Sequence, residues 1–221
     1  MNRKPYLATV LLLCVSPAYT DELPDLTGFY TSPMSFGPPQ ILGPDGVTFV
    51  DNPAPPFGDD PYTRMNCIPD TAFGYNPYGE QLVQTPGRLT WINQYNQIVR
   101  RIDITDGKQS MPENIKPSFT GYSLGHWEDD VLVVETTALR TIQVRGAPDW
   151  SRVERIEERI RSLEDGAKLE RITRFEAVTP EGKADTMTTR IVYQREPGEH
   201  LFEFICEEAA DRFEEFEQSA D

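Results

Sequence analysis

The chain has 221 residues, of which 36 are Asp or Glu and 21 are Lys or Arg, and its formal net charge is −15. A surface this acidic repels nucleic-acid phosphates and anionic lipids, which argues against both as partners. The length is sufficient for one sizeable core and suits a single β barrel or sandwich.

The first 18 residues are typical of a secretory signal peptide. The positive pair Arg3-Lys4 precedes an apolar stretch from Leu7 to Val15, and Ser16 and Ala18 provide the small residues required for cleavage. The stretch is far shorter than the roughly 20 residues of a membrane-spanning helix. We therefore expect cleavage after Ala18, a periplasmic or secreted mature protein and no membrane insertion. The alternative is a lipid anchor at Cys14.

Two cysteines, Cys67 and Cys206, remain after removal of the signal peptide and allow one pairing. An even count in an oxidising compartment favours a disulfide. The chain-entropy model gives about 4–5 kcal/mol for a bridge that closes a loop of more than 100 residues. Two free thiols are the alternative.

Residues 19–62 are expected to form an extended N-terminal segment. After an extended opening at 21–32, the part from Pro33 to Pro61 is rich in proline and glycine. Proline lacks the N–H that a sheet ladder requires, so an irregular or polyproline-like path is predicted. Apolar residues such as Phe36 and Phe49 indicate that this segment wraps around the body of the protein.

Residues 63–208 are predicted to form one β domain, followed by an acidic tail at 209–221. Apolar and β-branched runs alternate with turn signals such as Asp106-Gly107 and Asp165-Gly166, and little helix is expected. This regular spacing favours an antiparallel meander, either a lipocalin-like barrel or a strongly curved sheet. The predicted strands cover 89–92, 98–104, 122–127, 131–136, 156–163, 167–176, 186–194 and 201–206.

One part of this domain has two interpretations. Val153, Ile156, Ile160 and Leu163 have helical spacing, although the surrounding pattern is that of strands. We favour a short helical turn near 148–155 that leads into a strand.

The run at 121–137, Gly-Tyr-Ser-Leu-Gly-His-Trp-Glu-Asp-Asp-Val-Leu-Val-Val-Glu-Thr-Thr, resembles a motif of an uncharacterised family of secreted bacterial proteins. In that family the motif commonly reads Gly-His-Ser-x-Gly-x-Trp-Glu-Gly-Asp-Thr-Leu-Val-Val-Asp-Thr, and the resemblance covers about residues 60–208. It implies a secreted β-rich domain and brings no established activity. Tyr122 and Trp150 stand where the family usually has histidines, and Asp129 replaces a turn glycine.

Few patterns for metal binding or nucleophilic catalysis are present. The two histidines, His126 and His200, form no ligand-spaced pair, so neither a metal nor another cofactor is expected. Ser123 and His126 project from opposite faces of a strand and do not make a local dyad. The chain also lacks a nucleophile elbow, a phosphate-binding glycine loop and a dinucleotide fingerprint.

Tyr122, Leu124 and His126 alternate along one predicted strand and therefore share a face. A curved antiparallel sheet that closes on itself can enclose one small ligand, so this face is either a pocket wall or plain core. With residues of neighbouring strands and turns, the expected ligand-binding set is Tyr122, Leu124, His126, Trp91, Tyr95, Phe175, Arg100 and Arg101.

Three functions fit this pattern. The first is a module that binds a small apolar or aromatic ligand in a barrel-like pocket. The second is a cofactor-free isomerase, lyase or hydratase, in which His126 acts as acid or base, Tyr122 donates a hydrogen bond and Arg100 or Arg101 holds an anionic group. The third is a structural or scaffold role.

Overall fold

The computed structural model describes residues 23–32, 40–51, 73, 79–94, 98–140 and 150–202. The expected signal peptide, both expected disulfide cysteines, Tyr95 and the acidic tail lie outside the described residues.

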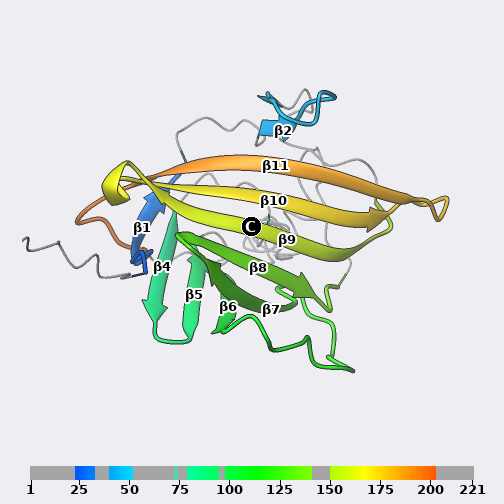
Figure 1. Cartoon of the computed structure of the whole chain (residues 1–221), viewed down its shortest axis with the longest axis horizontal. Coiled ribbons are helices and arrows are strands. Elements are labelled where there is room, and N and C mark those ends of the chain that lie inside the picture. The colour runs from blue at the N-terminus through cyan, green and yellow to red at the C-terminus, as the bar shows by residue number, and fades with distance from the viewer. Residues whose placement is uncertain are drawn as a thin grey trace, which may run out of the picture.

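A closed ring of nine strands dominates the described structure (Figure 1). The ring order is β1-β4-β5-β6-β7-β8-β9-β10-β11, and β1 pairs with β11 to close it. The prediction of a mainly β, barrel-like fold is confirmed. The described residues contain no α-helix and a single 3-10 turn at Glu164–Gly166. The strands are β1 (Gly28–Thr31), β2 (Gln40–Leu42), β3 (Phe49–Val50), β4 (Glu80–Thr85), β5 (Arg88–Asn93), β6 (Ile98–Thr105), β7 (Tyr122–Glu128), β8 (Val131–Thr137), β9 (Arg152–Leu163), β10 (Lys168–Val178) and β11 (Ala184–Arg195).

Strands β2 and β3 lie beside the ring rather than in it. They form a small hairpin in which Gln40 and Ile41 pair with Arg190 and Thr189 of β11. The described part of the proline-rich segment, 40–51, therefore adds short strands to the barrel instead of following an irregular path throughout.

The ring differs from a simple antiparallel meander at one pair. Strands β6 and β7 run parallel, with Ile102 opposite Ser123 and Thr105 opposite His126. Parallel neighbours need a long crossover, which residues 106–121 provide. We call these residues the crossover segment.

The prediction of a short helical turn near 148–155 is wrong for the residues that the structure describes, because β9 begins at Arg152. The register against β10 shifts between Glu176 and Ala177, so that Arg155 lies opposite Glu176 and Val153 opposite Ala177. This β-bulge separates the inward-facing Val153 and Ile156 by three positions, a spacing that imitates a helix.

The described residues in the interior of the barrel form two apolar clusters with a polar layer between them. Along β9, Ile160 belongs to the first cluster, Glu158 to the polar layer and Ile156 to the second cluster. On β10, Leu169, Arg171 and Phe175 follow the same sequence of layers.

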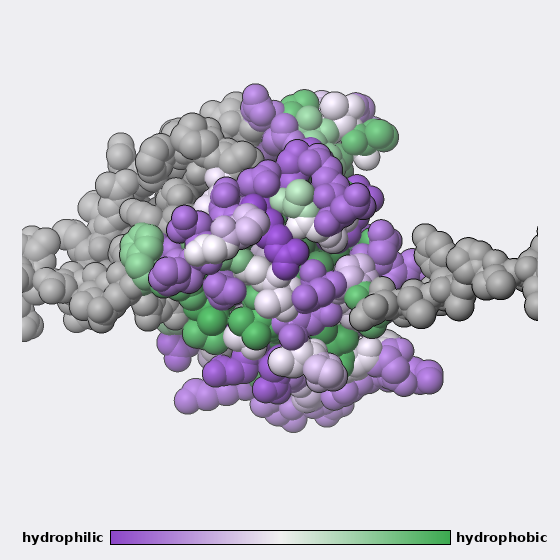
Figure 2. Space-filling view, turned by 90° about the vertical axis from the view of Figure 1, so that its left-hand side faces the viewer, coloured by the Kyte–Doolittle hydropathy of each residue, from purple (hydrophilic) through white to green (hydrophobic). Residues whose placement is uncertain are grey.

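Outside the ring, hydrophilic residues predominate on the face shown in Figure 2, with smaller hydrophobic areas between them. This distribution fits the alternation of inward and outward side chains along each strand.

Candidate functional site

An outer groove lies between the start of the crossover segment and the outward-facing side chains of three strands. Its volume is about 470 Å³. The groove arises from the path of the chain after β6. The chain leaves β6 at Thr105, continues beside the outer face of β7 and only then returns to start that strand. The lining residues are Thr105, Gly107, Gln109, Ser110 and Met111, Leu124–His126 and Glu128 of β7, Val133 and Glu135 of β8, and Arg155, Glu157 and Arg159 of β9.

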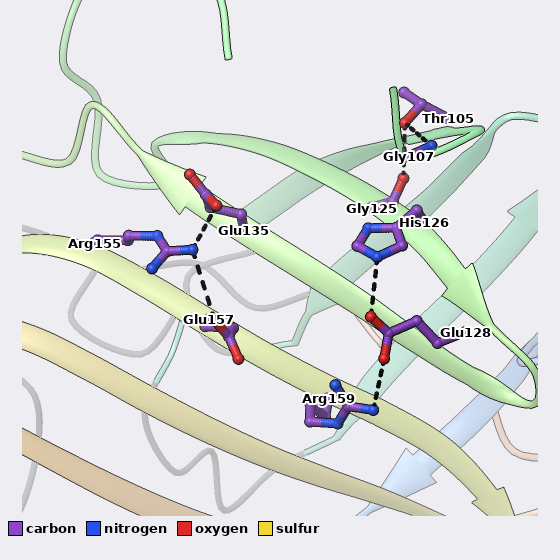
Figure 3. Close-up of polar contacts among 9 residues, drawn as sticks. All are labelled: Thr105, Gly107, Gly125, His126, Glu128, Glu135, Arg155, Glu157 and Arg159. Carbon is purple, nitrogen blue, oxygen red and sulfur yellow. Dashed lines mark hydrogen bonds and ion pairs between the residues drawn. The ribbon is translucent and has the colours of Figure 1, made fainter. Parts of the chain in front are cut away.

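The His126 side chain lies at one end of a polar chain in this groove, in which Glu128 stands between His126 and Arg159 (Figure 3). Its Nε2 is 3.3 Å from Oε1 of Glu128, and the other oxygen of Glu128 accepts a hydrogen bond of 2.9 Å from Arg159. The hydrogen bonds from Arg159 and then from His126 lower the pKa of the Glu128 carboxyl. The carboxylate thus fixes the imidazole, which remains 38% exposed and accessible to a ligand.

Gly107 brings the crossover segment close to the imidazole. Its φ of +79° is in the region that favours glycine, and a Cβ at this position would be 3.5 Å from the ring of His126. The backbone N–H of Gly107 donates to Oγ1 of Thr105, which in turn donates to the carbonyl of Gly125. These contacts attach the segment to β7.

A second polar cluster surrounds Arg155 on the other side of the groove (Figure 3). Its Nη2 lies 2.6 Å from Glu135 and 3.6 Å from Glu157, and its Nη1 lies 3.7 Å from Glu176. The hydrogen bond to Glu135 is the main cause of the raised pKa of Arg155. Three carboxylates and two guanidinium groups therefore line the groove, so a hydrogen-bond donor or a cation suits its rim better than an anion does.

The floor of the groove is apolar. Leu124 and Val133 point away from the barrel interior, yet only 7% and 8% of their surfaces are exposed. Met111 adds a third apolar side chain from the crossover segment. The groove thus combines an apolar floor with a charged rim, as ligand sites commonly do.

The structure divides the expected ligand-binding residues between two places. Leu124 and His126 line the outer groove, and Tyr122 shares their face of β7 without lining the groove. Trp91, Arg100 and Phe175 are buried inside the barrel instead. Arg101, next to Arg100, is exposed on the outer face of β6. The side chains of the two groups lie on opposite faces of the barrel wall, so they do not form one site.

Several groove residues were missed by the sequence reasoning. Glu128 could have been found, because it lies two positions after His126 and must share its face of a strand. Arg155 and Arg159 alternate with Glu157 along β9 but carry no signal of their own in such a charged chain. The lining by residues 107–111 depends on the crossover, which no local pattern reveals.

The polar layer inside the barrel is a second candidate site. Arg100 forms a two-pronged ion pair with Glu158, and it also donates to Ser123 Oγ at 3.2 Å and to Thr136 Oγ1 at 2.9 Å. Arg171 lies with its Nε 4.0 Å from the Glu158 carboxylate. Such pairing is what makes buried charges tolerable.

Glu80 is the second carboxyl group of this layer. Its Oε2 accepts a 2.6 Å hydrogen bond from Trp91 Nε1. Burial raises the pKa of Glu80 to about 7, although the charge of Arg171 and the hydrogen bond from Trp91 oppose the rise. This group can therefore change its protonation near neutral pH.

Within the part of the chain that the structure describes, no group of three or more His, Cys, Asp or Glu side chains is arranged to hold a metal ion. Over the same residues, no helix is long and apolar enough to span a membrane.

No protein family, curated protein or solved structure matched this chain in the comparisons with known proteins. The resemblance of the 121–137 run to a secreted bacterial family thus stays a prediction.

Proposed function

We propose that the protein binds a small molecule in the outer groove, as a periplasmic or secreted binding module. The observation that carries this proposal is the groove itself, whose volume of about 470 Å³ lies within the usual range for small-molecule sites. The ligand has an apolar or aromatic body and a polar group. Its body packs on Leu124, Val133 and Met111, and its polar group faces the charged rim.

The composition of the rim restricts the polar group further. Arg155 and Arg159 already contact carboxylates, whereas His126 offers a partly exposed imidazole. A hydroxyl or amine on the ligand can donate to the rim carboxylates or exchange hydrogen bonds with the imidazole.

The second candidate function is general acid–base catalysis in the same groove. It is favoured by the contact between His126 and Glu128, because a carboxylate that orients an imidazole is a common arrangement for proton transfer. Arg100 cannot take part there, since its side chain lies inside the barrel, and Arg101 does not line the groove. The residues of this alternative are therefore His126 and Glu128 rather than His126 with an arginine of β6.

Binding of the neutral dye prodan to the purified protein tests the proposal. We expect Leu124→Ala to weaken prodan binding about tenfold through loss of apolar contact. His126→Ala changes the affinity for ligands that carry a donor group. His200→Ala is the matched control, because His200 is exposed and does not line the groove, and it leaves binding unchanged.

Two outcomes would decide against the proposal. Prodan binding that is unchanged in Leu124→Ala would place the dye elsewhere. A stability loss of about 2–5 kcal/mol in Leu124→Ala, with no probe bound by the parent protein, would show that Leu124 is plain core. Turnover of a bound compound that is lost in His126→Ala while binding persists would favour the catalytic alternative.

A further inference from the structure

Phe73 lies inside the barrel, although it belongs to none of the barrel strands. Only 2% of its surface is exposed, and it packs in the second apolar cluster beside Trp150 and Phe175. Its ring lies over the guanidinium group of Arg100, 4.5 Å from the ring centroid. Its backbone carbonyl accepts a 2.9 Å hydrogen bond from Nη2 of Arg171. One residue thus presents an aromatic ring to one buried arginine and a carbonyl oxygen to another.

The contacts of Phe73 are those that an aromatic acid would make. Guanidinium groups stack on aromatic rings and also bind carboxylates, for which their donors are better matched than for a single carbonyl. In Phe73 the ring and the carbonyl carbon are separated by two carbon atoms. A phenylpropanoate has the same separation, and it ends in a carboxylate instead of a peptide carbonyl.

One further polar group on the inward face of the barrel wall lacks a hydrogen-bond partner among the described residues. Thr173 lies between Arg171 and Phe175 on the inward face of β10, and 1% of its surface is exposed. Its Oγ1 has no hydrogen-bond partner among the residues that the structure describes. A buried hydroxyl in this condition costs free energy, which an additional acceptor in the interior would recover.

Two buried guanidinium groups face this part of the interior. Arg100 is paired with Glu158, and the Nε of Arg171 lies 4.0 Å from the same carboxylate. A carboxylate is the ligand group that guanidinium donors bind best.

We propose that the interior of the barrel is a second binding site, specific for small aromatic carboxylates of the phenylpropanoate type, and that Phe73 occupies it in this structure. Arg100 stacks on the ligand ring and Arg171 binds its carboxylate. This site is separate from the outer groove and does not depend on it.

The test compares hydrocinnamate with the neutral hydrocinnamyl alcohol on the full chain. Binding is followed by calorimetry and by the indole N–H resonance of Trp91, whose ring lies 5.1 Å from the Arg171 guanidinium carbon. We expect wild type to bind hydrocinnamate, and Phe73→Ala to bind it about tenfold more tightly because no side chain has to be displaced. We expect the alcohol to bind at least about tenfold more weakly than the acid.

Arg171→Met should abolish the preference for the acid. Arg174→Met is the matched control, because Arg174 lies on the outer side of the same strand with a side chain that is 51% exposed. Where Phe73→Ala does not fold, Phe73→Leu and the wild type provide the same comparison. Equal affinity for acid and alcohol would reveal only an apolar cavity. A preference that survives Arg171→Met would show that another group binds the carboxylate. Either result overturns the proposal.

Absence of hydrocinnamate binding by the wild type would show that Phe73 is a permanent core residue, which also overturns it. His126→Ala should leave hydrocinnamate binding unchanged. The result is therefore independent of whether the outer groove binds prodan.

Discussion

At Arg100 the chain places a guanidinium group inside the barrel together with the partners that satisfy it. Glu158 provides the opposite charge, and Ser123 and Thr136 accept the remaining hydrogen bonds from neighbouring strands. The neighbouring Arg101 is exposed. The sequence identifies both arginines as candidates but does not reveal which one points inward. Successive side chains of a strand point to opposite faces, so one of the two must be buried in either case.

Glu80 is the residue for which a pH effect is expected. Its pKa is raised from 4.5 to about 7, mainly by burial. Between about pH 4.5 and pH 7 the folded state keeps a proton on Glu80 that the unfolded state has lost. The free energy of unfolding therefore falls as the pH rises through this range. This loss of stability levels off above about pH 7 and amounts to about 3 kcal/mol in total.

We therefore expect Glu80→Gln to gain stability relative to wild type as the pH rises from about 4.5 to 8, by about 3 kcal/mol. Urea unfolding of both proteins across this range measures the difference between their free energies of unfolding. The contributions of the other carboxyl groups cancel in this difference. A difference that is the same at every pH would contradict the prediction, because it would mean that Glu80 is ionised in both states.

Among the elements, the β7–β8 hairpin was the most predictable. The predicted turn at 128–130 is present, His126 pairs with Val133, and Asp129 adopts a φ of 53°. Aspartate tolerates this left-handed conformation better than most residues, so the turn follows from local chemistry. Strand β9 was harder to predict, because the bulge at Glu154 changes the spacing of its buried residues.

The crossover segment shows where local signals end. Asp106-Gly107 marks the end of β6 as predicted, since the strand stops at Thr105. Whether the next strand then runs parallel or antiparallel depends on contacts far along the chain. Ser118 supplies such a contact, because it bridges to Leu139 and exchanges backbone hydrogen bonds with Ala138 and Arg140.

Gly121 is expected to determine how this segment joins β7. Its φ is +62°, and an added Cβ would lie 2.6 Å from the carbonyl oxygen of Thr137. Gly121→Ala should therefore destabilise the protein by about 1–3 kcal/mol, measured by urea unfolding.

Gly182→Ala is the control for this prediction. Gly182 has a φ of +80° but no atom within 4 Å of the added Cβ, so its substitution carries the backbone penalty alone. The difference between the two variants isolates the clash with Thr137. A cost for Gly121→Ala no larger than that for Gly182→Ala would mean that the end of the crossover segment relaxes freely.

In the whole molecule, the prediction of a barrel succeeded because inward and outward residues alternate along nearly every strand. Its internal layering was not predicted, since Glu158 and Arg171 occupy positions where the pattern alone calls for apolar residues. The prediction of a Cys67–Cys206 disulfide remains open, because both residues lie outside the described part. Non-reducing peptide mapping of the purified protein would test it.

The closure of the ring depends on a short seam. Strands β1 and β11 share only two register pairs, Tyr30 with Arg195 and Thr31 with Gln194. The backbone N–H of Glu196 adds a 2.9 Å hydrogen bond to the carbonyl of Phe29. The side chain of Arg195 reinforces this seam, since it donates to the carbonyl of Thr27 and lies 5.8 Å from the ring centroid of Tyr30.

We expect Arg195→Ala to weaken this seam more than the rest of the barrel. Amide hydrogen exchange should accelerate in β1, where the seam is short, while the amides of β9 and β10, which share a long register, keep their protection. The global cost should be about 0.5–1.5 kcal/mol, the usual net value of one hydrogen bond. Arg152→Ala is the matched control, because that side chain is 62% exposed and pairs with its neighbour Glu154. Uniform acceleration over all strands would show that the ring opens only by complete unfolding, and unchanged exchange in β1 would show that the backbone pairs alone hold it closed.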